Sequence, residues 1–244
     1  KIINYISTNN MAVAPGRIVY TQWLNEQGGI SADLTVTRLA EDAYLVMTAF
    51  SSHTRDYNWL QRHIPSDAHA VLTDVTSAYA GINVQGPNSR ALLKQVSPDD
   101  FSNSVFPFGS SKEIQLGYAT IRASRISYVG ELGWELHHPI EMQNYLFDLL
   151  EKAGEKHGMK LVGARAQNWL RQEKSYRAFG NELGRDATPL EADLPRFVDQ
   201  EKEFRGKAAM QALGVRSKCC TLLIDGPEDA DPWGREALYL DGEK

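Results

Sequence analysis

Hydrophobic and polar residues alternate along several short segments of this chain and repeat at helical spacing along others. The alternating segments predict strands, which lie at 44–48, 81–85, 113–116, 118–128 and 220–224. Helical spacing predicts helices, which cover 54–64, 141–157 and 164–176, and a further one after Pro87 that carries Ala91, Leu92, Leu93 and Val96. Because hairpins join some of the strands, the pattern favours an α+β fold over a doubly wound parallel sheet.

Composition divides the chain into three parts. Most of the predicted helices and strands fall in residues 1–180, after which Asp, Pro and Gly become more frequent. Residues 181–217 are therefore expected to connect two units, and a new stranded unit is expected to begin in residues 218–244. The chain starts on Lys and ends just after a strand-like segment, which suggests a fragment of a longer protein.

Bulk properties exclude some classes of protein. The net charge is -5 and Lys and Arg form no run, so a nucleic-acid partner is not expected. The absence of an apolar run near 18 residues argues against a membrane span. The adjacent Cys219 and Cys220 would form a strained bridge, and they suggest a reducing compartment.

Familiar catalytic motifs are missing from the sequence. It has no phosphate-binding G-x-x-x-x-G-K-[ST], no G-x-G-x-x-G after a strand and no G-x-S-x-G nucleophile turn. H-E-x-x-H and C-x-x-C are also absent, so no metal site is expected. His137 and His138 would point to opposite faces of one strand, as one core and one surface residue. Any chemistry is therefore expected to use a bound cofactor or substrate with a few carboxylates.

The first informative stretch runs from Tyr20 to Val36 and predicts two strands joined by a Gly-Gly turn. Asp33 opens the second strand, although aspartate is depleted in strands. It can be interpreted as a turn cap at a hairpin end or as a functional carboxylate.

The second stretch runs from Arg125 to Leu136 and contains Tyr128 and Glu135, which a single straight strand would direct to opposite faces. Glycines at 130 and 133 predict a bend that brings both side chains to one cavity. A carboxylate at Glu135 facing inward needs a donor, and a pair with Arg125 or with Arg171 in the third stretch is the alternative that involves no ligand.

The third stretch, 170–183, reads as a charged helix end and a loop, followed by a Pro-initiated turn at 188–192. Together the three stretches resemble the glycine-cleavage T-protein family, and in particular the folate domains of dimethylglycine and sarcosine dehydrogenases. The paired patterns Y-x-G-E-x-G-x-E and L-R-x-E-K-x-[YF]-R-[AS]-x-G are the specific ones. The resemblance covers nearly the whole chain, including Gly86-Pro87, Phe204-Arg205-Gly206-Lys207 and Asp231-Pro232-Trp233-Gly234.

The resemblance implies three lobes around a central channel that holds tetrahydrofolate, the last lobe being a truncated β-barrel. Residues 1–180 would then be the folate-binding region, built from two interleaved α+β subdomains, with its N-terminal part missing here. The domain would capture the imine or formaldehyde equivalent from oxidative demethylation of an N-methylated amino acid, giving 5,10-methylenetetrahydrofolate. FAD would belong to a separate upstream oxidoreductase domain, in the same chain or a partner chain. The resemblance further implies the bacterial cytoplasm or the mitochondrial matrix.

The resemblance also assigns roles to particular residues. Asp33 would be the catalytic group near N10 and N5 of the folate, because a carboxylate there can position the amine and stabilise developing positive charge. Glu135 would hold the pterin through two parallel charge-assisted hydrogen bonds. The other expected folate contacts are Thr35, Tyr128, Arg165 and Tyr176.

One position departs from the family, since Gln167 stands where the T-protein has an arginine, and Arg165 is expected to substitute. Two alternatives remain open: a free-standing aminomethyltransferase acting on a lipoamide-carried substrate, and a non-catalytic folate-binding or regulatory subunit. The folate-binding factors for iron–sulfur maturation carry a cysteine motif whose place here reads 203–207 without cysteine. A regulatory subunit is expected to lose Asp33 or Glu135, and both are present.

Overall fold

Two antiparallel sheets form the framework of the chain in the computed structural model, which describes residues 1–227, 234 and 236–243. The first sheet has the order β1-β2-β3, with β1 at Ile18–Leu24, β2 at Ile30–Arg38 and β3 at Tyr44–Thr48. The second has the order β4-β7-β6-β5, with β4 at Tyr79–Gln85, β5 at Ser111–Leu116, β6 at Ala119–Ser124 and β7 at Gly133–Pro139. This mixed helix and strand architecture confirms the predicted class.

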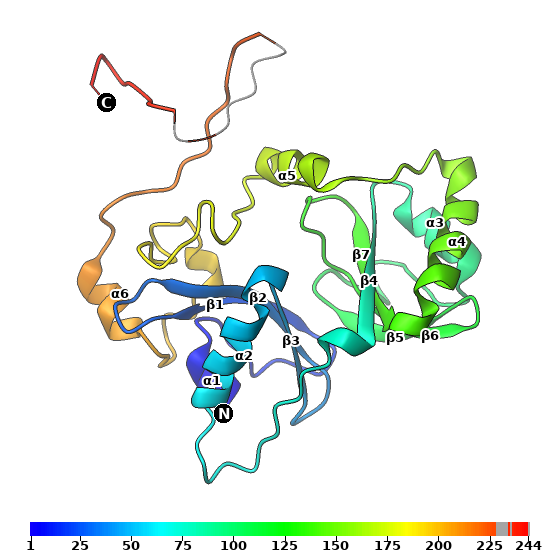
Figure 1. The fold of residues 1–244 in the computed structure, drawn as a ribbon, viewed down its shortest axis with the longest axis horizontal. Helices are drawn as coiled ribbons and strands as arrows, with labels where there is room; N and C mark the ends of the chain where they lie inside the picture. Colours follow the sequence, from blue (N-terminus) through cyan, green and yellow to red (C-terminus); the bar gives the residue numbers. More distant parts are fainter. Residues whose placement is uncertain (228–233, 235, 244) are drawn as a thin grey trace.

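Each of the two sheets has its own set of helices beside it (Figure 1). Near the first sheet lie α1 at Ile2–Ile6, α2 at His53–Arg62 and α6 at Lys207–Leu213, and against the second sheet lie α3 at Ser89–Val96 and α4 at Gln143–Gly154. Helix α5, at Ala164–Glu173, lies between the two sheets at one edge of the molecule. Short 3-10 turns occur at Phe50–Ser52, Thr76–Ala78, Ile140–Met142, Glu155–His157 and Pro195–Phe197. Among the described residues, no helix is long and apolar enough to cross a membrane.

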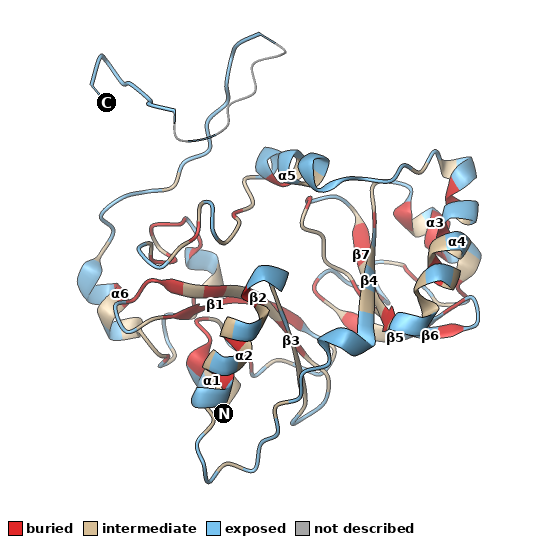
Figure 2. Cartoon of the chain, in the orientation of Figure 1, coloured by how far each residue is buried: buried red, intermediate tan, exposed pale blue. Residues whose placement is uncertain are grey.

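The first sheet is covered on both faces, which explains why β1 is buried along nearly its whole length (Figure 2). One face packs Trp23 and Leu34 into a cluster with α1 and α2. The other face packs Leu24 and Ile30 against residues of the 179–210 segment. The second sheet instead has a single core, on the side of α3 and α4, in which Trp134 is fully buried.

The main differences from the predicted elements occur at their ends. The strand expected at 118–128 ends at Ser124, and Tyr128 lies in a turn that leads to β7. The helix expected to reach Tyr176 ends at Glu173, because Ser175 adopts a left-handed conformation with φ of 58°. The strand expected at 220–224 is not formed, since no other described strand pairs with this exposed segment.

The described sheets do not close into a barrel. The three lobes around a channel therefore stay a prediction, and so does the final barrel in 218–244. The domain limits at 180 and 217 also stay predictions. The 231–234 turn that contributed to the resemblance lies largely outside the described residues.

Candidate functional site

Asp33 lies in the middle of β2 rather than at its start, because β2 begins at Ile30. The interpretation of Asp33 as a turn cap is therefore wrong. Its direct partner across the hairpin is Gln22, and the two side chains share one face of the sheet. Thr35 follows on the same strand face and pairs with Tyr20 and Met47, so the structure places Thr35 beside Asp33 as predicted.

The carboxyl group of Asp33 is held by polar neighbours in a largely apolar setting. Nε2 of Gln22 donates a hydrogen bond of 2.9 Å to Oδ1 of Asp33. Burial raises the pKa of Asp33 from 3.8 to about 6, while hydrogen bonds from Gln22 and Tyr20 oppose this rise. None of the ion pairs in the described part of the chain involves Asp33. A carboxyl group that titrates this close to neutral pH can both accept and return a proton.

Tyr20 completes the polar face around Asp33. Burial, and then the charge of Asp33, raise the pKa of the Tyr20 hydroxyl, so this group stays a neutral donor. Its ring packs edge-on against Phe197, with the ring centroids 4.7 Å apart. This contact holds Tyr20 between the sheet and the segment that covers it.

Tyr128 brings the second sheet to the same region. It occupies the turn between β6 and β7, where Gly130 has a φ of 69° that suits glycine. Its hydroxyl donates a hydrogen bond of 3.1 Å to the carbonyl oxygen of Arg177. Burial raises the pKa of Tyr128, Arg171 opposes the rise, and the charges of Glu182 and Asp33 add to it. Tyr128 therefore lies within electrostatic reach of Asp33. The bend predicted from the two glycines is present, whereas a cavity that Tyr128 shares with Glu135 stays a prediction.

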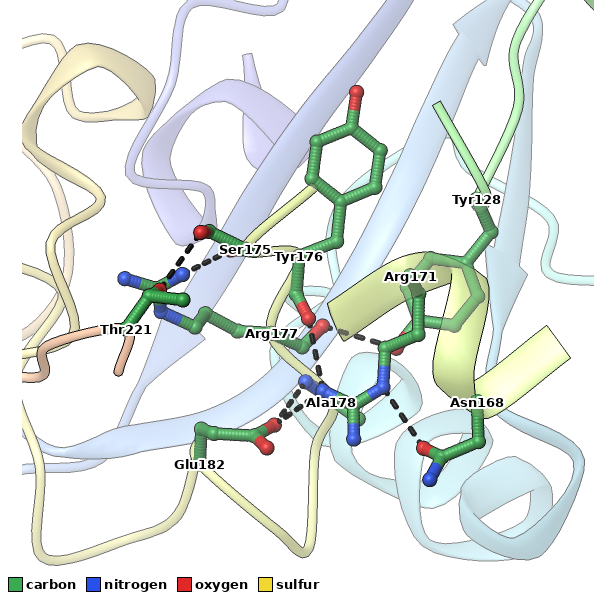
Figure 3. A network of polar contacts seen from close by, with 9 residues as sticks. All are labelled: Tyr128, Asn168, Arg171, Ser175, Tyr176, Arg177, Ala178, Glu182 and Thr221. Carbon is green, nitrogen blue, oxygen red and sulfur yellow. Dashed lines mark hydrogen bonds and ion pairs between the residues drawn. The ribbon is translucent and has the colours of Figure 1, made fainter. Parts of the chain in front are cut away.

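Arg171 organises the loop that follows α5, as Figure 3 shows. It is 2% exposed, and its guanidinium donates to Oδ1 of Asn168 at 2.9 Å, to the carbonyl oxygen of Tyr176 at 2.8 Å and to Oε2 of Glu182 at 2.7 Å. The same Glu182 oxygen accepts the backbone N–H of Ala178 at 2.9 Å. The buried guanidinium of Arg171, paired with the partly exposed Glu182, thus holds the shape of this loop.

Glu135 lies on β7 between Trp134 and Leu136, which are both fully buried in the core on the α3 and α4 side. Because side chains alternate along a strand, Glu135 points to the opposite face of the sheet. Its carboxylate lies 3.5 Å from Nε2 of His137, and its side chain is 21% exposed. The alternative in which Glu135 pairs with Arg125 or Arg171 is wrong, because Arg171 pairs with Glu182 and Arg125 donates to the carbonyl oxygen of Phe106.

The two remaining predicted contacts come from α5 and its loop. Arg165 lies in the first turn of α5 on an exposed position. Tyr176 is half-buried, and its ring points away from the polar network of Arg171 (Figure 3). Backbone atoms of Tyr176, rather than its hydroxyl, take part in that network.

Sequence reasoning missed the partners of Asp33, namely Tyr20 and Gln22. A regular hairpin that continued the Leu24–Ile30 pair would place Ala32 opposite Gln22. The register shift between Trp23 and Leu24 moves the pairing by one residue and brings Asp33 opposite Gln22. The unusual polar residue at position 22 of an apolar strand was the available signal.

The fold and these paired stretches define an aminomethyltransferase-type domain. Residues 1–202 match the model of the GCVT N-terminal domain, and the chain belongs to that family. It is 35% identical over 228 residues to mitochondrial dimethylglycine dehydrogenase of Homo sapiens, an alignment that covers 90% of this chain and 26% of the relative. It is 34% identical over 220 residues to the aminomethyltransferase of Chlorobium limicola, which covers 89% of this chain and 60% of the relative.

A solved structure shares the fold. The glycine cleavage system aminomethyltransferase T from Bartonella henselae superimposes with a TM-score of 0.75 at 26% identity, over 86% of this chain and 56% of the other. The chain thus spans about a quarter of the dehydrogenase and somewhat over half of the aminomethyltransferases that it matches. The predicted family is confirmed.

Proposed function

We propose that this domain binds tetrahydrofolate and transfers a one-carbon unit to it, with Asp33 as the catalytic group. The observation that carries the proposal is a partly buried carboxyl group, without a cation partner among the described ion pairs, whose pKa lies at about 6. A purely structural role does not explain this aspartate, because burying an unpaired charge lowers the stability of the folded state. Family membership supplies the reaction class.

The residues present suit a reduced folate. Its pterin edge offers two adjacent N–H donors, and Glu135 offers a carboxylate on the face of the second sheet away from its core. Tyr128 adds a flat amphipathic side chain near Asp33. Thr35, Arg165 and Tyr176 are proposed as the remaining contacts.

When bound, tetrahydrofolate supplies the amines that take up the one-carbon unit. Asp33 would hold the attacking N–H and accept its proton as the nitrogen lone pair forms the bond to the methylene carbon of an iminium or formaldehyde equivalent. The electron pair of the carbon–nitrogen or carbon–oxygen π bond would move to that heteroatom, to which Asp33 would return its proton. Asp33 would then accept the proton of the second folate N–H as that nitrogen bonds to the methylene carbon. With formaldehyde this second proton completes the departing water, and with an iminium, which departs as the amine, it passes to solvent.

The source of the one-carbon unit is proposed from the relatives. Their names include a dehydrogenase of dimethylglycine, so we propose that the intact protein oxidises an N-methylated amino acid on a separate FAD domain. This chain then carries only the transfer step. The match to the aminomethyltransferase of Chlorobium limicola covers more of the relative, 60% against 26%, whereas the dehydrogenase is slightly more identical, 35% against 34%.

The test is calorimetric titration of the chain with 5-formyltetrahydrofolate, which is stable to air. Glu135→Ala removes the charge-assisted pair and should weaken binding about ten- to a hundred-fold, from roughly 1.5–3 kcal/mol. The matched control is Glu113→Ala on β5 of the same sheet, whose side chain is 67% exposed and pairs with Arg122. The control should bind like the unchanged chain. Equal binding by the chain and Glu135→Ala would overturn the role of Glu135, and no binding by the unchanged chain would count against the folate site.

A further inference from the structure

Gln22 is an unusual residue for its position on β1. Its side chain is fully buried, with 0% exposure, on a strand whose other core-facing residues are mostly apolar. One end of its amide donates to Asp33, whereas no protein group in the described part of the chain bonds its buried Oε1. An amide left half-satisfied in a core is costly, which points to a role other than packing.

The two ends of this amide are therefore held differently. The carboxylate of Asp33 determines which end faces it, because an ionised carboxylate only accepts hydrogen bonds. At the other end, no described protein atom determines the orientation. The direction of the Gln22 amide thus depends mainly on the protonation state of Asp33, with the neutral Tyr20 hydroxyl as the other polar group that its side chain meets.

A carboxyl group that exchanges a proton changes its hydrogen-bonding character. When protonated, it gains an O–H donor that needs an acceptor. The amide of Gln22 carries both a donor and an acceptor at equal reach, and a half-turn about its last bond exchanges them. An apolar or positively charged residue at this place would satisfy at most one of the two states.

We propose that Gln22 is a positioning residue for Asp33, donating through Nε2 when Asp33 is ionised and accepting through Oε1, after a half-turn, when Asp33 is protonated. This inference deepens the proposed function, because it gives Asp33 a partner in both halves of a proton-transfer cycle. It concerns the ligand-free protein and can be tested without folate.

Other groups also face Asp33 from the elements around it. Tyr20, on β1, donates to the carboxylate, and Tyr128, in the turn between β6 and β7, lies within electrostatic reach. Arg171 acts on Tyr128 and is paired with Glu182. The two tyrosines remain neutral when Asp33 titrates, so their charge stays constant while the effect of Gln22 on the titration is measured.

The test measures the Asp33 titration by carboxyl carbon NMR in Gln22→Met, which keeps the volume and removes the amide. Hydrogen bonds to an ionised group are stronger than those to a neutral one, so the pKa of Asp33 should rise by about one unit, or ten-fold in proton affinity. The control is Gln115→Met on β5, an exposed glutamine that bonds Thr120 in the other sheet. An Asp33 titration that is the same in Gln22→Met and in the unchanged chain would overturn the proposal.

A second measurement addresses the half-turn in the unsubstituted chain and does not depend on a variant folding. The Nε2 protons of Gln22 should show a hydrogen-bonded chemical shift and contacts to Asp33 above the midpoint, and should lose both below it. An amide that keeps its contacts on both sides of the midpoint would overturn the half-turn. Since neither experiment uses folate, failure of the folate site would be seen only in the calorimetric titration.

Discussion

At the scale of single residues, burial sets the chemistry of Asp33. Its carboxyl group lies between Gln22 and Tyr20 on a sheet face that the 179–210 segment covers. The pKa of about 6 means that the folded protein binds this proton more tightly than the unfolded chain does. Asp33 therefore stabilises the fold least at the pH where its proposed catalytic role needs an ionised carboxylate.

Replacing Asp33 should therefore change the stability of the protein in a way that depends on pH. The sign follows from the raised pKa: the stability associated with Asp33 is full below pH 4 and is lost as the pH rises to about 6 and beyond. Asp33→Asn should thus increase the free energy of unfolding at pH 7.5 by up to about 3 kcal/mol, and by almost nothing at pH 4. Urea unfolding at both pH values measures the difference.

The control for this substitution is Asp148→Asn on the exposed side of α4, which should be neutral at both pH values. In the intact enzyme, Asp33→Asn should also slow one-carbon transfer by roughly 10²–10⁴-fold, the usual contribution of a general base. If the difference in the free energy of unfolding between Asp33→Asn and the unchanged chain is the same at pH 4 and at pH 7.5, the raised pKa of Asp33 is contradicted.

At the scale of secondary structure, the β1–β2 hairpin positions Asp33 through its turn. Gly28 has a φ of 85°, which favours glycine, and Gly29 lies against the backbone of the segment that follows α5. The N–H of Ile30 donates to the carbonyl oxygen of Ala187 at 2.9 Å, and Nδ2 of Asn25 donates to that of Arg185 at 3.2 Å. The hairpin and this segment therefore form one unit that covers Asp33.

Gly29→Ala tests this contact. A Cβ atom at position 29 would lie 1.7 Å from the carbonyl oxygen of Arg185, so the hairpin and the segment must separate. We expect a loss of stability of about 1–3 kcal/mol or more, typical of overpacking, in chemical unfolding. Gly184→Ala is the matched control, since nothing lies within 4 Å of a Cβ atom there. Similar stability of the two variants would show that this close approach is not required.

At the scale of the whole molecule, contacts between distant segments join the two sheets and the C-terminal part. Backbone bonds tie Gly16 and Ile18 to Ser111 and Gly109, which fixes the first sheet against the second. Near the other end, the buried carboxylate of Glu191 accepts hydrogen bonds from Arg216, at 2.7 Å from Nε and 2.9 Å from Nη2. The chain keeps contact with the body as far as Thr221, whose hydroxyl donates to Oγ of Ser175 at 2.7 Å, and the exposed residues 222–227 then lead away from it (Figure 1).

The Glu191–Arg216 pair should release the C-terminal segment in acid. Hydrogen bonds from Arg216 lower the pKa of Glu191 from 4.5 to about 2. The stability that this pair contributes is therefore full above pH 4.5 and is lost as the pH falls to about 2. Hydrogen exchange of the Arg216 amide, which donates to Glu191 at 3.1 Å, should show protection at pH 7 that disappears over this range.

Glu191→Gln should remove most of that protection at pH 7, whereas Glu201→Gln, at an exposed position, should leave it unchanged. Exchange that is equally slow in both variants would show that other contacts hold the segment. The backbone bond from Cys219 to the carbonyl oxygen of Glu191, at 2.8 Å, provides a second amide to follow.

The sequence by itself determined the local elements and the family. Apolar periodicity located most helices and strands, because a sheet face or helix stripe that packs on a core leaves its period in the chain. It also indicated the Gly-rich bend at 130–133 and the hairpin that carries Asp33, and the ordered motifs identified the family that the comparisons confirm.

Only the tertiary structure decided what surrounds Asp33. A one-residue register shift brings Gln22 opposite it, and residues more than a hundred positions away in the chain cover the same face. The pairing of Arg171 with Glu182, rather than with Glu135, was likewise settled by the path of the loop after α5. The strand expected at 220–224 did not form, because a strand needs a partner and local pattern cannot supply one. Register, burial and partner choice all depend on distant segments, so local periodicity carries little information about them.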